Sequence, residues 1–148
     1  MAHPQSPEKR VVVDGERILG VVHWVESPKC QLTSTHTLAN AMPLVWGCGV
    51  RSTMKIAQWM SVWAKHDPGE RHLHFGPIAV EPDAQGCGIG GLLLKQFCGR
   101  LDDSSMVGYL ETDTAENVRF YSRFGFQVTR TWPVHGIVNY FMRREAKP

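Results

Sequence analysis

The sequence predicts an α/β (α+β) fold with a mixed, mostly antiparallel central sheet and helices on both faces. Three observations predict it: an apolar strand over 72–80 that runs into glycines and a leucine-rich helix, a hairpin pattern near each end, and a helical insert between residues 26 and 71. Short β-branched runs interleaved with helical periods are typical of a sheet covered by helices. A chain of 148 residues fits one domain, so we expect a flexible tail over 1–10 and a single domain over 11–148.

The first expected elements are two strands joined by a tight turn. Residues 11–13 and 18–25 are rich in β-branched residues, and Asp14-Gly15 lies between them. An Asp-Gly pair readily adopts the positive backbone angles of a two-residue hairpin turn. We therefore expect a β-hairpin at this end of the chain.

The insert is expected to hold one firm helix. Prolines and glycines interrupt residues 26–51, so any helix there should be short, with 38–42 as the best candidate. Over 53–65 the apolar residues follow a helical period: Ile56, Trp59, Met60 and Trp63. Such a stripe is more often core than the floor of a substrate pocket, and we expect core here.

The second half predicts alternating strands and helices that end in an antiparallel hairpin. We expect strands over 72–80 and 107–112, helices over 88–100 and 115–124, and a closing hairpin of strands over 127–132 and 137–143.

Composition excludes several classes of function. The net charge is +2, and basic residues form no run interleaved with aromatics, so we expect no nucleic-acid partner. No apolar stretch is long enough for a membrane span, and the first ten residues lack the apolar region of a secretory signal. We therefore expect a cytoplasmic protein that does not bind a membrane. Its cysteines are expected to be reduced thiols: Cys30, Cys48, Cys87 and Cys98.

We expect no metal site. His72 and His74 lie two residues apart and so face the same side of one strand, where they could share a proton or a metal. Histidines satisfied within the structure are the commoner outcome, however, and two ligands alone do not make a zinc site.

The glycine cluster Gln85-Gly86-Cys87-Gly88-Ile89-Gly90-Gly91 predicts a diphosphate site. It lies where a strand passes into a helix, so its amides point out from a helix N-terminus, where unpaired donors and the helix dipole favour anions. A P-loop is excluded because Gly-Lys-Ser/Thr is absent. A dinucleotide-binding reading keeps some support, since the glycines match G-x-G-x-x-G and Glu111 follows at the ribose position. Residues 81–85 and the antiparallel C-terminal hairpin argue against that reading.

Two motifs resemble the GNAT superfamily of N-acetyltransferases. Gln85-Gly86-Cys87-Gly88-Ile89-Gly90 resembles its Q/R-x-x-G-x-G/A pyrophosphate loop, and residues 117–126 resemble its second signature, which ends in Tyr-x-x-x-Gly-Phe. The order of the elements is similar to a subgroup with a helical insert between its third and fourth strands. The resemblance implies the GNAT-like acyl-CoA N-acyltransferase fold. Because only ten residues precede Val11, we expect the N-terminal strand and helices of the family to be shortened or missing.

The resemblance implies acetyl-CoA as cosubstrate and a set of residues that bind it. The arm of CoA is expected between two splayed strands, with its diphosphate on the loop. The implied binding residues are Ile78, Ala79, Val80, Gln85, Gly86, Cys87, Gly88, Ile89, Gly90, Gly91, Thr114, Asn117 and Tyr121. Cys87 has no catalytic role in this reading. The family commonly has Arg or Lys within the loop and this chain does not, so backbone donors should do most of the binding.

The resemblance also implies two catalytic residues. Tyr121 matches the tyrosine that protonates the departing thiolate, and Glu111 matches an acidic residue that some members use as general base. Each has a structural alternative, since Tyr121 could anchor the core and Glu111 could pair with Arg119 or Arg123.

The function expected from these residues is acetyl transfer from acetyl-CoA to a primary amine, a small molecule or a peptide, by direct attack in a ternary complex. The alternative is an acyl-CoA-binding module or sensor with little catalysis. An uncovered sheet edge invites a second chain, so we expect a homodimer.

Overall fold

The computed structural model describes residues 8–30 and 34–147, and only the backbone of residues 34–42. Its helices are α1 (Ser34–His66), α2 (Ile89–Ser104) and α3 (Ala115–Ser122), with a short 3₁₀ helix at Pro82–Ala84. Its strands are β1 (Glu8–Asp14), β2 (Arg17–Glu26), β3 (His72–Val80), β4 (Val107–Thr112), β5 (Gln127–Val134) and β6 (Ile137–Arg144).

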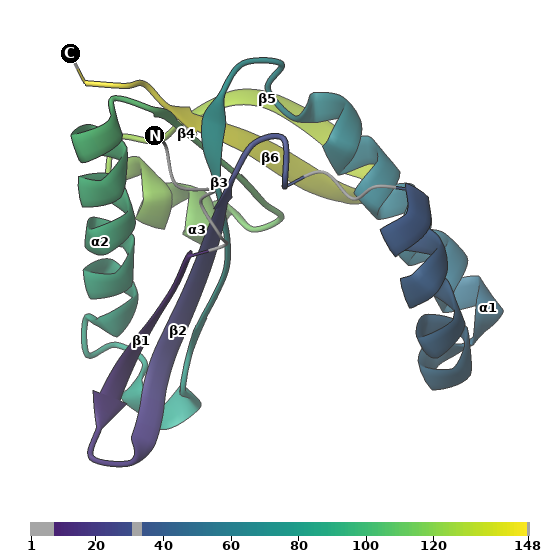
Figure 1. The fold of residues 1–148 in the computed structure, drawn as a ribbon, viewed down its shortest axis with the longest axis horizontal. Coiled ribbons are helices and arrows are strands. Elements are labelled where there is room, and N and C mark those ends of the chain that lie inside the picture. The colour runs from purple at the N-terminus through teal and green to yellow at the C-terminus, as the bar shows by residue number, and fades with distance from the viewer. Residues whose placement is uncertain (1–7, 31–33, 148) are drawn as a thin grey trace.

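The strands form one six-stranded sheet in the order β1-β2-β3-β4-β6-β5 (Figure 1). The pair β3–β4 is parallel and the other neighbouring pairs are antiparallel. The element order and the mixed, mostly antiparallel sheet are as the sequence predicts. Strand β1 begins at Glu8, so residues 8–10 of the expected tail belong to the sheet; residues 1–7 lie outside the described residues.

The helical insert differs from the prediction. Helix α1 runs from Ser34 to His66 and includes Pro43, whereas only a short helix over 38–42 and a second one from 53 were expected. Its one break is at Gly49, whose φ of 80° and ψ of 161° are outside the helical region. A residue with a side chain rarely adopts this conformation, so the glycine, and not the proline, marks the bend.

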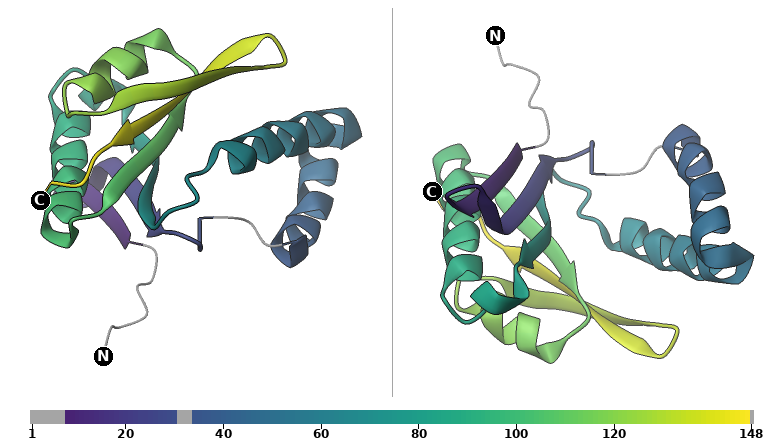
Figure 2. Two further views of the ribbon diagram at one scale, coloured as in Figure 1. Left: turned by 90° about the horizontal axis from the view of Figure 1, so that it is seen from above. Right: turned by 90° about the horizontal axis from the view of Figure 1, so that it is seen from below.

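Helices α2 and α3 cover one face of the sheet. Leu93, Leu94, Phe97 and Leu101 of α2 are fully buried against that face. Phe97 lies 4.7 Å, centroid to centroid, from Phe75 of β3. The core of the protein therefore lies between α2 and the central strands, and Figure 2 shows both helices on this side.

Helix α1 meets the opposite face only near its C-terminal end. Trp63 Nε1 donates a hydrogen bond of 2.9 Å to Asn139 Oδ1 of β6, and the His66 ring stacks 4.3 Å from Phe141. The rest of α1 projects away from the sheet (Figure 2), and both Ile56 and Met60 are exposed. Helices on both faces are confirmed, but the expectation that the apolar stripe of this helix is core is wrong.

The parallel strands β3 and β4 separate soon after they begin. Their pairing is confined to His72↔Val107, Leu73↔Gly108 and His74↔Tyr109. Beyond this point β3 continues to Val80, paired on its other side with β2. The result is an opening in the sheet between the ends of β3 and β4.

Two further observations bear on the expectations from composition. All four cysteines lie in the described part of the chain and are free thiols. Within residues 8–30 and 34–147, the helices are too short or too polar to cross a membrane.

Candidate active site

The glycine turn presents backbone donors at the start of α2. Gly86 and Gly88 have φ values of 79° and 82°, which side chains rarely adopt, and Gly88 is the N-cap residue. No side chain caps this end, and the first helical bond joins the Leu92 amide to the Gly88 carbonyl at 3.0 Å. Among the described residues, no hydrogen bond is formed by the amides of residues 86–91. A cluster of unpaired amides at a helix N-terminus is an anion site.

These amides face a groove of about 1040 Å³. Most of the residues predicted to bind CoA line it: Ile78, Ala79, Val80, Gln85, Gly86, Gly88, Ile89, Gly90, Gly91, Asn117 and Tyr121. Arg119 and Arg123 of the α3 region line the same groove. From the sequence these two arginines were expected only as partners of Glu111. The neighbouring helix thus brings two cations to the groove, although the glycine turn itself has none.

Two predicted binding residues do not line the groove. The Thr114 hydroxyl is the N-cap of α3 and accepts a hydrogen bond of 3.2 Å from the Asn117 amide. Cys87 is exposed on the turn. The Asn117 side chain, which does line the groove, donates to Thr112 Oγ1 at 3.1 Å.

The free edge of β3 forms one wall of this groove. The Glu81 amide donates to the Leu19 carbonyl at 2.8 Å, toward β2. Because backbone groups alternate along a strand, those of Ile78 and Val80 point the other way, into the opening between β3 and β4. Gln85 Nε2 donates to the Val80 carbonyl at 3.1 Å, so this side chain ties the turn to the end of the strand.

A second cavity of about 700 Å³ lies on the α1 side of the sheet. Trp59, Met60 and Trp63 of α1 line it, together with Glu111 at the end of β4. The half-buried tryptophans therefore form a pocket wall, whereas the sequence predicted that they would lie in the core.

Tyr121 lies at the boundary between the groove and the second cavity. It lines both cavities, as do Ile78 and Asn117. Its ring is buried in T-shaped contact with Phe75, at 6.0 Å, and burial raises the pKa of its phenol. Its two predicted roles, core anchor and acid, are therefore compatible, because the ring packs in the core while the residue faces the cavities.

Glu111 pairs with a histidine and not with an arginine. Its Oε2 lies 2.8 Å from His74 Nε2, and its side chain is buried. Arg119 and Arg123 are on the other side of the sheet, in the groove. Burial acts to lower the pKa of His74, but the hydrogen bond and charge of Glu111, with the charge of Asp67, raise it overall.

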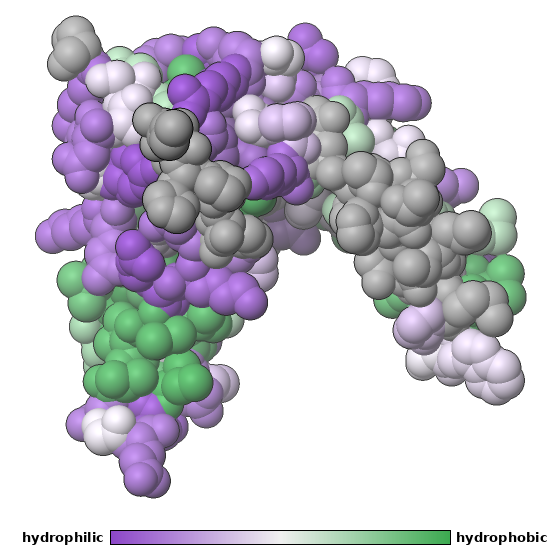
Figure 3. Space-filling view, viewed as in Figure 1, coloured by the Kyte–Doolittle hydropathy of each residue, from purple (hydrophilic) through white to green (hydrophobic). Residues whose placement is uncertain are grey.

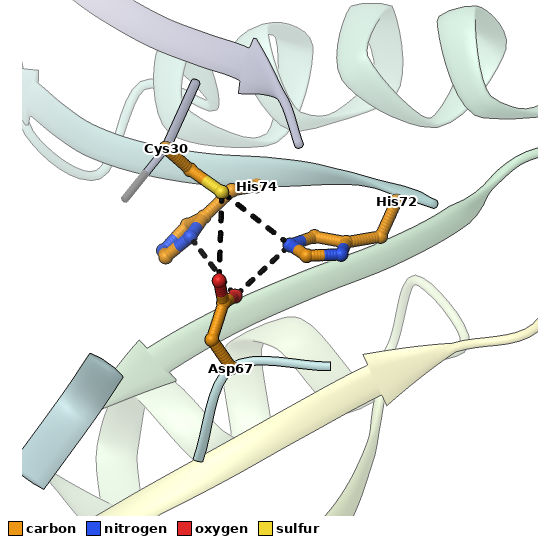
Figure 4. A group of neighbouring side chains, drawn as sticks. All are labelled: Cys30, Asp67, His72 and His74. Atoms are coloured by element: carbon orange, nitrogen blue, oxygen red, sulfur yellow. Dashed lines mark hydrogen bonds and ion pairs between the residues drawn. The ribbon is translucent and has the colours of Figure 1, made fainter. Parts of the chain in front are cut away.

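A cluster that the sequence did not predict lies beside this pair. Cys30, Asp67, His72 and His74 place one ligand atom each within 4.8 Å of one another (Figure 4). Burial acts to lower the pKa of His72, but its hydrogen bonds with Asp67, Cys30 and the Glu70 carbonyl raise the pKa to about 9. The shared face of the two histidines was readable from their spacing. The approach of Cys30 and Asp67, from the two ends of the insert, had no local signal.

Three features of this chain are typical of the fold of acyl-CoA N-acyltransferases. They are the parallel strands that separate, the glycine turn at the edge of the opening, and the two cavities that share lining residues. Residues 49–128 match the acetyltransferase (GNAT) domain family. The chain belongs to this family of acyltransferase enzymes. The dinucleotide-binding alternative is thereby excluded, and Glu111, its expected ribose ligand, lies on the face opposite the glycine groove.

Solved structures share this fold at low sequence identity. The polyamine N-acetyltransferase of Drosophila melanogaster is 16% identical with a TM-score of 0.67, over 97% of this chain and 84% of that one. A protein of Corynebacterium glutamicum, described as histone acetyltransferase HPA2 and related acetyltransferase, is 19% identical with a TM-score of 0.64, over 96% and 66% of the two chains. The NatC complex bound to Gag peptide and CoA is 13% identical with a TM-score of 0.58, over 94% of this chain and 71% of that one.

Proposed function

We propose that this protein transfers the acetyl group of acetyl-CoA to a primary amine by direct attack in a ternary complex. The observation that carries the proposal is that Tyr121 lines both the groove and the second cavity. The groove presents unpaired amides and two arginines, the second cavity is lined by aromatic residues and a carboxylate, and Ile78 and Asn117 also line both. A thioester bound along the first would reach an amine bound in the second.

The groove would hold CoA through three kinds of contact. The amides of residues 86–91 and the guanidinium groups of Arg119 and Arg123 would bind the diphosphate, since charge-assisted contacts to phosphate are the strong ones. The backbone groups of Ile78 and the amide of Val80 would pair with the pantetheine arm as an added strand does. An oriented amide at this edge would stabilise the developing oxyanion by about 3 kcal/mol.

The transfer would need a base and an acid on either side of the thioester. The ammonium proton of the substrate passes to the Glu111 carboxylate, directly or through water, and the freed amine attacks the carbonyl carbon. The C–S bond then breaks, and the leaving thiolate takes the proton of the Tyr121 phenol. The nitrogen of the new amide gives up its second proton, which passes through water to the phenolate and restores Tyr121. The hydrogen bond from His74 holds Glu111 at the end of β4, beside the cavity.

The second cavity, on the α1 side of the sheet, is the proposed acceptor cavity. Its lining favours an amine that carries an apolar part. Trp59, Met60 and Trp63 offer apolar surface, while Glu111 and Asp113 offer negative charge to an ammonium. Two of the similar structures are an agmatine N-acetyltransferase and a polyamine N-acetyltransferase, which supports an amine acceptor. We propose a small amine or a peptide amine, in the cytoplasm, as the acceptor.

The proposed active form is a homodimer. Strand β1 is at the edge of the sheet, and Val11, Val13, Ile18 and Val21 of the β1–β2 hairpin are exposed. Figure 3 shows the apolar area over this hairpin. A second copy would cover both the apolar surface and the unpaired strand edge. A single species of monomer mass in light scattering at micromolar concentration would contradict this assembly.

Replacement of Tyr121 by Phe tests the proposed chemistry. The variant keeps the buried ring but loses the proton, so kcat should fall tenfold or more, by the usual size of acid catalysis. Turnover is followed as free CoA thiol released from acetyl-CoA with a panel of amines.

Thermal stabilisation by CoA separates binding from chemistry. Ligand that binds only the folded state raises its stability, so Tyr121→Phe should keep the stabilisation that the unmodified protein shows. Tyr140→Phe is the matched control, because Tyr140 packs against the same core but lines neither cavity. Stabilisation by CoA without thiol release from any amine would favour the binding module, and an unchanged kcat in Tyr121→Phe would remove its role as acid.

A further inference from the structure

Four potential metal ligands meet where the helical insert joins the sheet. Cys30 precedes α1, Asp67 directly follows it, and His72 and His74 lie on β3 (Figure 4). We propose that these four side chains bind a structural Zn²⁺ ion.

The distances between the ligand atoms suit one tetrahedral ion. Cys30 Sγ lies 3.6 Å from Asp67 Oδ2 and 3.7 Å from His72 Nε2. Asp67 Oδ1 lies 3.0 Å from His72 Nε2 and 3.8 Å from His74 Nδ1. Zinc bonds of about 2.3 Å to sulfur and about 2.0–2.1 Å to nitrogen or oxygen, at tetrahedral angles, place ligand atoms roughly 3.3–3.6 Å apart. Small adjustments of the side chains would therefore bring all four onto one ion.

Both histidine rings are oriented as such a site requires. His72 Nδ1 lies 2.8 Å from the Glu70 carbonyl, and His74 Nε2 lies 2.8 Å from Glu111 Oε2. Each of these oxygens only accepts, so the ring nitrogen facing it carries the proton. In a neutral ring the other nitrogen then has a free lone pair, and in both residues that nitrogen faces the cluster. Histidines that bind zinc donate their second N–H to a carbonyl or carboxylate in this way.

Hydrogen bonds alone leave this cluster incompletely satisfied. His72 is fully buried, and the Asp67 side chain is 4% exposed. His74 Nδ1 is buried and has no hydrogen-bond partner among the described residues. A buried polar atom without a partner is costly, and a cation at the centre of the four groups would satisfy it.

The donor set selects the kind of metal. Thiolate and imidazole ligands favour zinc or a related transition metal over Mg²⁺ and Ca²⁺, which prefer oxygen. Four protein ligands leave no open position, which is typical of a structural zinc site. Cys30 and His74 line the same cavity as the two tryptophans. The ion would fasten both ends of the insert to β3. This departs from the expectation of no metal site.

Metal binding can be measured on the full chain without a histidine tag. After removal of metal by chelator, one equivalent of Zn²⁺ is added, and loosely bound ion is removed by desalting. We expect about one zinc per chain by mass spectrometry. We also expect Tm to rise by about 5–10 °C at a hundredfold excess over Kd, as linkage gives for a chain of this size. Co²⁺ in place of Zn²⁺ should give the absorption of tetrahedral cobalt with a thiolate charge-transfer band.

Paired variants locate the ion. Cys30→Ser should remove the thiolate band, and His74→Gln should weaken zinc binding tenfold or more, whereas Cys48→Ser, which alters an exposed cysteine on α1, should change neither. The cobalt spectrum of the unmodified protein reports sulfur ligation even if a variant fails to fold. A chain that retains no zinc after desalting overturns the proposal, as does a thiolate band that persists in Cys30→Ser.

Discussion

The two faces of the sheet are built from different chemistry. The face under α2 is apolar and tightly packed, with Leu93, Phe97 and Met142 fully buried. The face toward α1 carries polar and ionisable side chains at the alternate positions of the same strands. They include His72, His74, Tyr109, Glu111 and Asn139.

This division separates stability from chemistry. Because side chains alternate along a strand, β3 and β4 contribute to both faces, with Leu73 and Leu110 in the core and His74 and Glu111 at the acceptor cavity. A substitution on the α2 face should therefore change the free energy of unfolding most, and one on the α1 face should affect the site.

Phe97→Ala should have the largest effect on stability. The side chain is fully buried and contacts the rings of Trp24, Phe75 and Phe126. Removal of a buried phenyl ring leaves a cavity, and we expect a loss of about 3–5 kcal/mol in the free energy of unfolding, measured by urea denaturation. Leu92→Ala is the control on the same helix, since Leu92 is 48% exposed, and should cost less than about 1 kcal/mol. Equal losses would contradict the placement of the core.

Trp63→Phe should have a smaller effect, on the α1 face. It removes the donor to Asn139 Oδ1 but keeps an aromatic ring. Asn139 is fully buried, and an acceptor left without its partner costs about 1–3 kcal/mol. Hydrogen exchange should show the loss at the C-terminal end of α1. Trp46→Phe, at a position 85% exposed, should stay within about 0.5 kcal/mol of the unmodified protein. If the two variants behave alike, the contact between α1 and β6 does not anchor the helix.

The same division explains which elements could be predicted from the sequence. Strands β3 and β4 have the predicted bounds, because the first part of β3 and nearly all of β4 are buried, and both apolar runs end at turn residues. Helix α1 was predicted poorly because most of it projects from the sheet. Its pattern is not constrained by burial, and the signals of Pro43 and Gly47 suggested breaks that the structure does not have.

The candidate site was predictable where its signal is local. The glycine turn and the Tyr121 region are short motifs, and the structure brings them to one groove. Pairs that depend on tertiary structure were not predictable. Cys30 and Asp67 are 37 residues apart in sequence and meet only because the insert returns to its starting point. The partner of Glu111 was misassigned for the same reason, since only the sheet register places His74 beside it.

A charged contact at the end of the α2 face should give the smallest effect, and one that depends on pH. Asp102 of α2 lies 2.7 Å from Arg144 and 3.0 Å from Lys147. Burial acts to raise the pKa of Asp102, but the two cations outweigh it and lower this pKa below its ordinary value. A lowered pKa in the folded state stabilises the fold at every pH above the unfolded value of about 3.9, and the contribution is lost as pH falls through the folded value.

Asp102→Asn should therefore cost about 1 kcal/mol at pH 7, because a charge-assisted contact of a half-buried group is partly screened. The difference between the two proteins should persist from pH 7 to pH 5, begin to shrink near pH about 3.9 and disappear once the pH is below the folded pKa. Urea denaturation across this range measures it, with Asp103→Asn at the exposed neighbouring position as control. A difference that does not shrink in acid would mean that the contact acts through packing and not through charge.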